Sequence, residues 1–273
     1  GKAVTTGLYN TIVGGEALST NIDGDNNTAI GYQALKNFEA DADGLGNNTA
    51  VGSLSQKLAT TGQFNTSLGS SALGGNYLAG DYNIGVGYRA GFNISIGERN
   101  VAVGHDSLRT EDGSSGCVAI GYSALLNQNA AANARNVAIG DEAGFALTTG
   151  TNNVFVGGLA GDGLTTGIDN VAIGMHALSA ANAGSRSVAI GKSALNLQNA
   201  GSAGQNMYNT AVGYEAGVNV TTGIRNTLIG SQAGDAMTTG EENLAVGFQA
   251  LSTNIDGDKN VALGNYALQD FEA

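Results

Sequence analysis

A nine-residue pattern recurs fifteen times along this chain of 273 residues, and it limits the fold more than any other feature. The pattern reads Asn, usually a β-branched residue, Ala, an aliphatic residue, Gly, two variable residues, Ala, and Leu or Gly. Clear copies are NTAIGYQAL from Asn27 and NVAIGMHAL from Asn170. Successive copies lie 17 residues apart in ten of fourteen cases, and the other four spacings are longer. Because no spacing is shorter than 17 residues, the sequence predicts coils of fixed circumference that tolerate insertions at the surface.

The first half of each repeat has the character of a short strand that ends in a corner. The second and fourth positions share one face of a strand and hold Val, Ile, Thr or Leu, whereas the third position is Ala in ten copies and faces the other way. The fourth positions form an aliphatic stripe made of Val13, Ile30, Val51, Leu68, Val86, Val103, Ile120, Ile139, Val156, Ile173, Ile190, Val212, Ile229, Val246 and Leu263. The fifth positions are all glycine, as a corner with positive φ or close backbone approach requires. These corner glycines are Gly14, Gly31, Gly52, Gly69, Gly87, Gly104, Gly121, Gly140, Gly157, Gly174, Gly191, Gly213, Gly230, Gly247 and Gly264.

Two further positions predict how the coils stack. Asn fills the first position in thirteen copies, replaced only by Cys117 and Ser187, and stacked Asn side chains can form an amide ladder. The eighth position is Ala thirteen times and Ser at Ser55 and Ser107, which indicates a tightly packed site.

These patterns predict an all-β fold, a narrow parallel β-roll or β-solenoid of about fifteen coils. A connector of eight residues leaves no room for a helix of ~10 or more residues. Seventeen residues at ~3.3 Å each give a perimeter of roughly 56 Å, enough for two short strands and two corners per coil. Fifteen coils at ~4.8 Å each predict a rod about 70 Å long.

The strand is apolar on both faces, which predicts association. If one face packs inside the coil, the other must pack against a neighbouring chain, because soluble monomers rarely expose a long continuous apolar stripe. We therefore expect a homo-oligomer along the coil axis, with the fourth-position stripe as interface or core. Strand arithmetic alone leaves both two and three chains open.

The composition argues against several kinds of partner and structural element. The chain has 11 basic and 23 acidic residues, a net charge of −12, so nucleic acid and anionic membranes are unfavourable partners. No apolar run is long enough to insert in a bilayer. One Cys and no Pro leave no intrachain disulfide and no proline-rich linker.

The chain reads as one repetitive domain, residues 1–273, and as part of a longer array. It starts at Gly1 without Met, and residues 18–40 are echoed by residues 251–273 at an offset of 233. A second long repeat therefore begins as this chain ends.

The copies NTAIGYQAL, NVAIGDEAG from Asn136 and SVAIGKSAL from Ser187 resemble the YadA-like head repeats of trimeric autotransporter adhesins. Similar repeats also build the β-rolls of phage and phage-like tail fibres. The resemblance covers nearly the whole chain and implies a left-handed parallel β-roll with three chains, exposed on a cell surface or virion. The 17-residue coil and the recurrent Thr-Thr-Gly turns depart from the adhesin pattern and look more like a tail-fibre shaft.

Few residues have the type and spacing that catalysis or cofactor binding needs, so we predict neither catalytic nor cofactor-binding residues. His105 and His176 occupy variable positions in coils four apart, and Cys117 has no His in its own coil. A polysaccharide-degrading fibre enzyme is the alternative from another class, and it needs paired carboxylates within ~5–10 Å. The acidic candidates are scattered among coils: Glu16, Asp106, Asp141, Glu142 and Glu215.

One loop and its echo form a candidate calcium site. Asp23 and Asp25, with Asp256 and Asp258, alternate around a Gly as oxygen ligands of Ca²⁺ can, but no bidentate Glu closes the loop. The alternative is an Asp- and Gly-rich surface turn.

Recognition is expected on loops and corners. Aromatic residues after the corner glycine could bind sugars: Tyr32, Tyr88, Tyr122, Tyr214 and Phe248. Insertions in solenoids often bind partners, and here they lie at residues 37–47, near Asn76, at 127–135 and at 197–208. We expect a structural and adhesive fibre segment that binds a cell-surface glycan or protein receptor by multivalency, or else a purely structural shaft.

Overall fold

The computed structural model describes residues 4, 6–39, 45–131, 133–180, 183–202 and 204–270. This part of the chain holds one three-residue strand for each repeat, and it contains no helix. The strands are β1 (Thr11–Val13), β2 (Thr28–Ile30), β3 (Thr49–Val51), β4 (Thr66–Leu68), β5 (Ile84–Val86), β6 (Val101–Val103), β7 (Val118–Ile120), β8 (Val137–Ile139), β9 (Val154–Val156), β10 (Val171–Ile173), β11 (Val188–Ile190), β12 (Thr210–Val212), β13 (Thr227–Ile229), β14 (Leu244–Val246) and β15 (Val261–Leu263).

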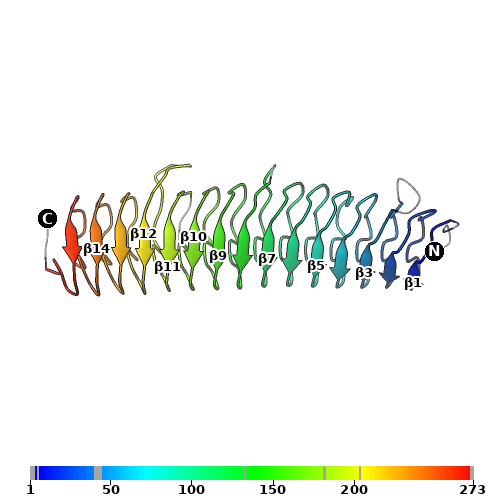
Figure 1. Cartoon of the computed structure of the whole chain (residues 1–273), viewed down its shortest axis with the longest axis horizontal. Helices are drawn as coiled ribbons and strands as arrows, with labels where there is room; N and C mark the ends of the chain where they lie inside the picture. The colour runs from blue at the N-terminus through cyan, green and yellow to red at the C-terminus, as the bar shows by residue number, and fades with distance from the viewer. Residues whose placement is uncertain are drawn as a thin grey trace. The chain divides into compact units, whose positions relative to one another are not determined.

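The chain forms a parallel β-solenoid of about 14 turns, with about 17 residues in each turn. It divides into two compact units, Gly1–Arg135 with β1 to β7 and Asn136–Ala273 with β8 to β15. Within each unit every strand pairs in parallel with the strand one coil away, position for position, as Val171 does with Val188 and Ile173 with Ile190 (Figure 1). The all-β solenoid predicted from the repeat is confirmed.

The expectation of two strands per coil is wrong for the described residues. After the corner, the seventh and ninth positions are left-handed, which interrupts any run of extended residues. The seventh positions have φ between 50° and 61°, and the ninth positions have φ between 45° and 63°. The residue before each first-position Asn, or before its Cys117 or Ser187 replacement, is also left-handed, with φ between 50° and 75°.

These left-handed residues are mostly not glycine, so each costs roughly 1 kcal/mol of strain. Hydrogen bonds between coils offset that cost, because they give the turn its own ladder. The seventh-position N–H of Gln33 donates to the carbonyl of Gly15 one coil back at 2.9 Å. The ninth-position N–H of Leu35 donates to Ser55 one coil forward at 3.0 Å. The turn therefore stacks as regularly as the strand does.

The corner glycines show why the fifth position does not vary. All fifteen have φ between 116° and 144°, a region that residues with a side chain rarely adopt. At Gly191, a Cβ would lie 2.2 Å from the carbonyl oxygen of Gly213, the corner of the next coil. Positive φ and close backbone approach therefore act together at the corner.

The interior of each coil is narrow and lined by small side chains. Third-position residues such as Ala119 and eighth-position residues such as Ala124 are fully buried, and so are Ser55 and Ser107. Leu side chains at the ninth position, such as Leu125, complete the interior.

Within a coil, the size of the ninth-position side chain is balanced by that of the residue three positions later. Where the ninth position is Gly, the residue three positions later is apolar and largely or fully buried, as in the pairs Gly91 and Ile94, Gly144 and Leu147, Gly161 and Leu164, Gly217 and Val220, Gly234 and Met237. A Cβ at Gly91 would lie 3.0 Å from Cδ1 of Ile94. Where the ninth position is Leu, the later position is often polar and buried: Asn21, Glu111, Gln128, Gln198 and Asn254. In these coils one large apolar side chain therefore comes from either of two positions, whereas the coil of Leu35 and Phe38 buries both.

Candidate interaction surface

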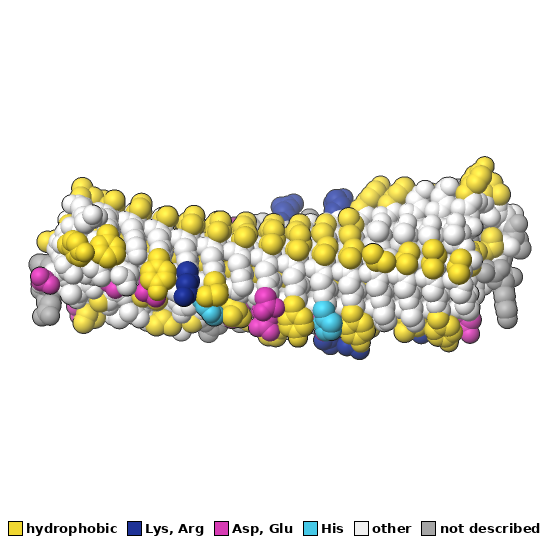
Figure 2. All heavy atoms as spheres, turned by 90° about the horizontal axis from the view of Figure 1, so that it is seen from below, with side chains coloured by type: hydrophobic (Ala, Val, Ile, Leu, Met, Phe, Trp, Pro, Cys, Tyr) yellow, Lys and Arg dark blue, Asp and Glu magenta, His cyan; other side chains and the backbone are white. Residues whose placement is uncertain are grey.

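The second and fourth positions of the strands point outward, and we call these side chains the strand rows. The strand burial pattern shows a buried middle residue between two that keep solvent exposure, as in Val118, Ala119 and Ile120. Ile120 is 36% exposed and Ile173 is 37% exposed, although both belong to paired strands. Figure 2 shows hydrophobic side chains repeating coil by coil in such rows. The fourth-position stripe thus lies on the outer face, and the Ala column forms the core.

The strand rows are bordered by two others. The corner row consists of the sixth positions: Gly15, Tyr32, Ser53, Ser70, Tyr88, His105, Tyr122, Asp141, Gly158, Met175, Lys192, Tyr214, Ser231, Phe248 and Asn265. The edge row consists of the residues before each repeat: Tyr9, Asn26, Asn47, Phe64, Tyr82, Arg99, Gly116, Arg135, Asn152, Asp169, Arg186, Tyr208, Arg225, Glu242 and Lys259. An apolar centre is therefore flanked by aromatic and charged side chains.

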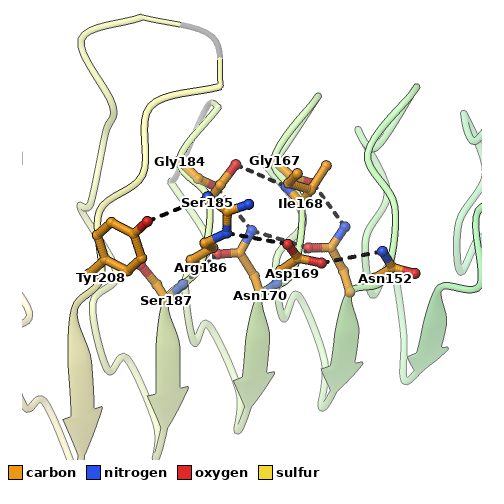
Figure 3. A network of polar contacts seen from close by, with 11 residues as sticks. Asn152, Gly167, Ile168, Asp169, Asn170, Gly184, Ser185, Arg186, Ser187 and Tyr208 are labelled. Carbon is orange, nitrogen blue, oxygen red and sulfur yellow. Dashed lines mark hydrogen bonds and ion pairs between the residues drawn. The ribbon is translucent and has the colours of Figure 1, made fainter.

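The first-position asparagines form the predicted amide ladder beneath the edge row. Asn170 Oδ1 accepts the backbone N–H of Ser187 at 2.9 Å, and its Nδ2 donates to the carbonyl of Gly184 at 2.9 Å (Figure 3). The same two contacts recur at Asn153, which accepts from the N–H of Asn170 and donates to Gly167. These side chains are fully buried, so each satisfies backbone groups that water cannot reach.

We predict that Asn170→Ala lowers the free energy of unfolding by about 2 kcal/mol or more, because it leaves the N–H of Ser187 and the carbonyl of Gly184 buried without partners. Asn152→Ala is the matched control, since Asn152 lies on the exposed edge row. Thermal unfolding at one protein concentration measures both. Equal melting temperatures for the two variants would contradict the ladder's role.

The edge row carries ion pairs and ring stacking between coils. Arg186 Nε lies 3.5 Å from Asp169 Oδ2, and Asn152 Nδ2 donates to Asp169 Oδ1 at 3.3 Å (Figure 3). Arg186 also donates to the Tyr208 hydroxyl at 3.5 Å. Exposed pairs of this kind contribute little to the free energy of unfolding.

The corner row contains the aromatic residues considered for sugar binding. The rings of Tyr88, His105 and Tyr122 are spaced by 5.1 and 5.4 Å, so each ring faces its neighbour one coil away. Arg89 covers the Tyr88 ring at 4.8 Å. Most ring faces in this cluster are therefore covered by a neighbouring ring or by Arg89, which leaves few faces on which a sugar could stack. Lys192 similarly lies 5.8 Å from the centre of the Tyr214 ring.

The residues considered for catalysis lie apart in the structure. His105 Nδ1 is 3.2 Å from Asp106 Oδ2, and Arg109 is 3.8 Å from the same carboxylate oxygen. This is a surface ion cluster within one turn, and no serine or cysteine nucleophile contacts it among the interactions of the described residues. Cys117 is buried, with its Sγ 3.7 Å from the Ser114 hydroxyl.

Two of the four calcium candidates accept backbone hydrogen bonds. Asp25 Oδ1 accepts the N–H of Leu8 at 2.6 Å, and Asp258 Oδ1 accepts the N–H of Glu241 at 2.8 Å. In the loop itself, Asn21 Oδ1 accepts the N–H of Gly24 at 3.0 Å and closes a turn. Asp23 and Asp256 sit in the equivalent turns, and the described residues contain no group of three or more His, Cys, Asp or Glu placed to hold a metal ion.

The inserted connectors lie in the segment between the turn and the next strand. The described part of the connector 197–208, residues 197–202 and 204–208, projects between β11 and β12 (Figure 1). Residues 40–44, within the connector 37–47, lie outside the described residues.

One buried acid was not predicted from the sequence. Glu111 is fully buried, and burial raises its pKa from 4.5 to about 7, against the opposing effect of N–H donors at Ser114, Ala130 and Gly113. Its burial could have been inferred from the ninth position of the same coil. Where that position is Leu, as at Leu108, the residue three positions later is often polar and buried.

No protein-family model matches this sequence, and no curated protein is significantly similar to it. A search of the described residues for an apolar helix long enough to span a membrane finds none.

Proposed function

We propose that this chain is a structural and adhesive segment of a homotrimeric fibre, with left-handed β-roll coils and exposure on a cell surface or virion. The observation that supports it most is the outward strand rows. In the unit with β8 to β15, the strand rows from β8 to β11 hold only Val and Ile. A folded single chain leaves these side chains partly in water.

The physical argument for association is the continuity of this surface. At ~4.8 Å between parallel strands, the fourth-position row of each unit presents an aliphatic strip about 30 Å long. The second-position row widens this strip with Val, Ile or Leu, except at β1 to β4, β12 and β13, where it is Thr. Monomers rarely expose contiguous apolar patches above a few hundred Å². The polar and aromatic corner and edge rows border the strip, as the rim of a protein interface borders its apolar core.

Three chains, the left-handed coil and the extracellular location rest on the resemblance to YadA-like head repeats and tail-fibre rolls. Three parallel copies would also present each connector three times, so weak individual contacts to a glycan or protein receptor would add by avidity. A purely structural shaft is the alternative within the same architecture.

The assembly is tested with Ile120→Asp and Val103→Asp, both on the outward strand rows. Because these side chains do not fill the coil, we expect each variant to fold as a single chain of about 27 kDa and to lose assembly, since a carboxylate would be buried in an apolar interface. Sedimentation measures the mass, and circular dichroism checks the fold. Thr222→Asp, on the exposed Thr-Thr-Gly turn, is the control that should keep the assembly.

A wild-type chain that sediments as a stable monomer would refute the homotrimer, as would variants that assemble normally. The adhesive role is measured separately, by binding of wild-type protein to immobilised glycans and receptors. Absence of all binding would favour the shaft, and reproducible cleavage of a polysaccharide would favour the enzyme class instead.

A further inference from the structure

A small hollow opens in the unit 1–135, next to the inserted connector 127–135. It has a volume of about 130 Å³ and is lined by Arg99, Ser115, Gly116, Asn133 and Arg135. Arg99, Gly116 and Arg135 are successive members of the edge row. A Cβ at Gly116 would meet only Cγ of Arg135, at 3.5 Å. The missing side chain therefore leaves a gap between two arginines, one coil to either side.

The lining offers mainly hydrogen-bond donors. Each guanidinium carries five N–H groups, the Asn133 amide carries two, and the hydroxyl of Ser115 accepts the N–H of Glu98 at 2.8 Å and still has a hydrogen to donate. The residues that line the hollow include no carboxylate. Glu98 pairs with Arg99 at 3.0 Å and thus reduces, without cancelling, the positive charge. A cluster of this kind suits an oxyanion.

This arrangement is unusual for the chain, which has 11 basic against 23 acidic residues. Elsewhere on the edge row the arginines face carboxylates one coil away: Arg186 pairs with Asp169, and Arg225 pairs with Glu242 at 3.1 Å. At the hollow, Gly116 stands where a carboxylate would stand in those pairs. The edge row is therefore locally cationic only here.

The size of the hollow and its neighbours indicate the ligand. Sites for whole small molecules typically enclose ~300–1,000 Å³, so this hollow fits one acidic group of a larger ligand. The two preceding members of the edge row, Phe64 and Tyr82, stack at 5.0 Å and are 45% and 52% exposed. An apolar surface thus leads along the row to the two arginines.

We propose that this hollow binds a carboxylate or sulfate group of an acidic polysaccharide, whose neighbouring sugars lie over Phe64 and Tyr82. The proposal rests on the adhesive role above and gives it a ligand class. Affinity per chain can be measured whether or not the chains assemble, so failure of this site and failure of the trimer are distinguishable.

The test is titration calorimetry of the wild-type protein with three probes: an oligogalacturonate for carboxylate, a heparin oligosaccharide for sulfate, and a neutral maltooligosaccharide. We expect binding of at least one acidic probe and none of the neutral one, and the acidic probe that binds identifies the group. Arg135→Ala should weaken binding about tenfold, because it removes a charge-assisted contact.

Gly116→Asn fills the gap without removing charge and should weaken binding by a similar factor. Asn is tolerated in the left-handed conformation, and Asn26, Asn47 and Asn152 already occupy the edge row. Arg186→Ala is the control, since Arg186 occupies the equivalent repeat position in the other unit but pairs with Asp169. Circular dichroism checks that every variant is folded.

Three results would overturn the proposal. The first is that neither acidic probe binds the wild-type protein. The second is that Arg135→Ala and Gly116→Asn bind as wild type does, which would indicate attraction outside the hollow. The third is that a polyglutamate peptide binds as tightly with the same losses in both variants, which would assign the hollow to an acidic protein partner.

Discussion

Gly157→Ala should destabilise the solenoid by about 4 kcal/mol, the sum of backbone strain and overpacking. Gly157 has φ of 133°, and a Cβ there would lie 2.7 Å from the carbonyl carbon and 2.8 Å from the carbonyl oxygen of Gly174. Hydrogen bonds hold this residue on both sides, because the carbonyl of Gly174 accepts the N–H of Ala177 at 3.1 Å and its N–H donates to Val156 at 2.8 Å. The coils can only separate at this corner, and thermal unfolding measures the loss.

Gly158 is the matched control, one residue further along. A Cβ there would meet nothing closer than the carbonyl oxygen of Asp141 at 4.0 Å, and its φ is not in the left-handed region. Gly158→Ala should therefore unfold close to wild type or slightly above it. If both substitutions cost the same, the requirement for glycine at the corner is not steric.

Glu111→Gln should stabilise the protein by up to about 3 kcal/mol above pH 7 and leave it unchanged near pH 4. Burial raises the pKa of Glu111 from 4.5 to about 7, so the folded chain holds this proton more tightly than the unfolded chain. Stability contributed by the neutral acid is complete below pH 4.5 and falls as the pH rises to about 7. Gln keeps an oxygen to accept the N–H of Ser114, which Glu111 Oε1 accepts at 2.7 Å.

Neighbouring coils support the same substitution. The equivalent position is Ile94 one coil back and Gln128 one coil forward, and both are fully buried. Urea unfolding of wild type and variant from pH 4 to pH 8.5, at one protein concentration, isolates the contribution of Glu111. Asp141→Asn, at an exposed corner position, is the control for the loss of one carboxylate from the chain. A variant with the wild-type pH dependence would show that Glu111 is charged in the folded protein.

The repeat predicted more of the fold than of the surface. Strand, corner glycine, Asn ladder and small eighth position all follow from residue types at fixed spacing, because each coil places the same chemistry at the same place. The left-handed seventh position escaped prediction, since Gln33, His176 and Leu159 share no preference for positive φ. Hydrogen bonds to the adjacent coil hold them there.

The candidate surface could be predicted only in part. That Val and Ile would form a stripe was evident, whereas the hollow at Gly116 was not. The sequence shows Arg99, Gly116 and Arg135 far apart, at unequal spacing, because the insertion at 127–135 lies between two of them. Stacking of the coils brings them into one row.

The sequence by itself determined the period, the parallel stacking and the corners, because a 17-residue repeat with an unvarying glycine permits few closed coils. It left open which apolar face of the strand lies inside. Only the closed coil decided that, because the interior of the β7 coil holds Ala119 beside Leu125, whereas Val118 and Ile120 keep solvent exposure. The larger side chains therefore point outward, where the proposed assembly would cover them.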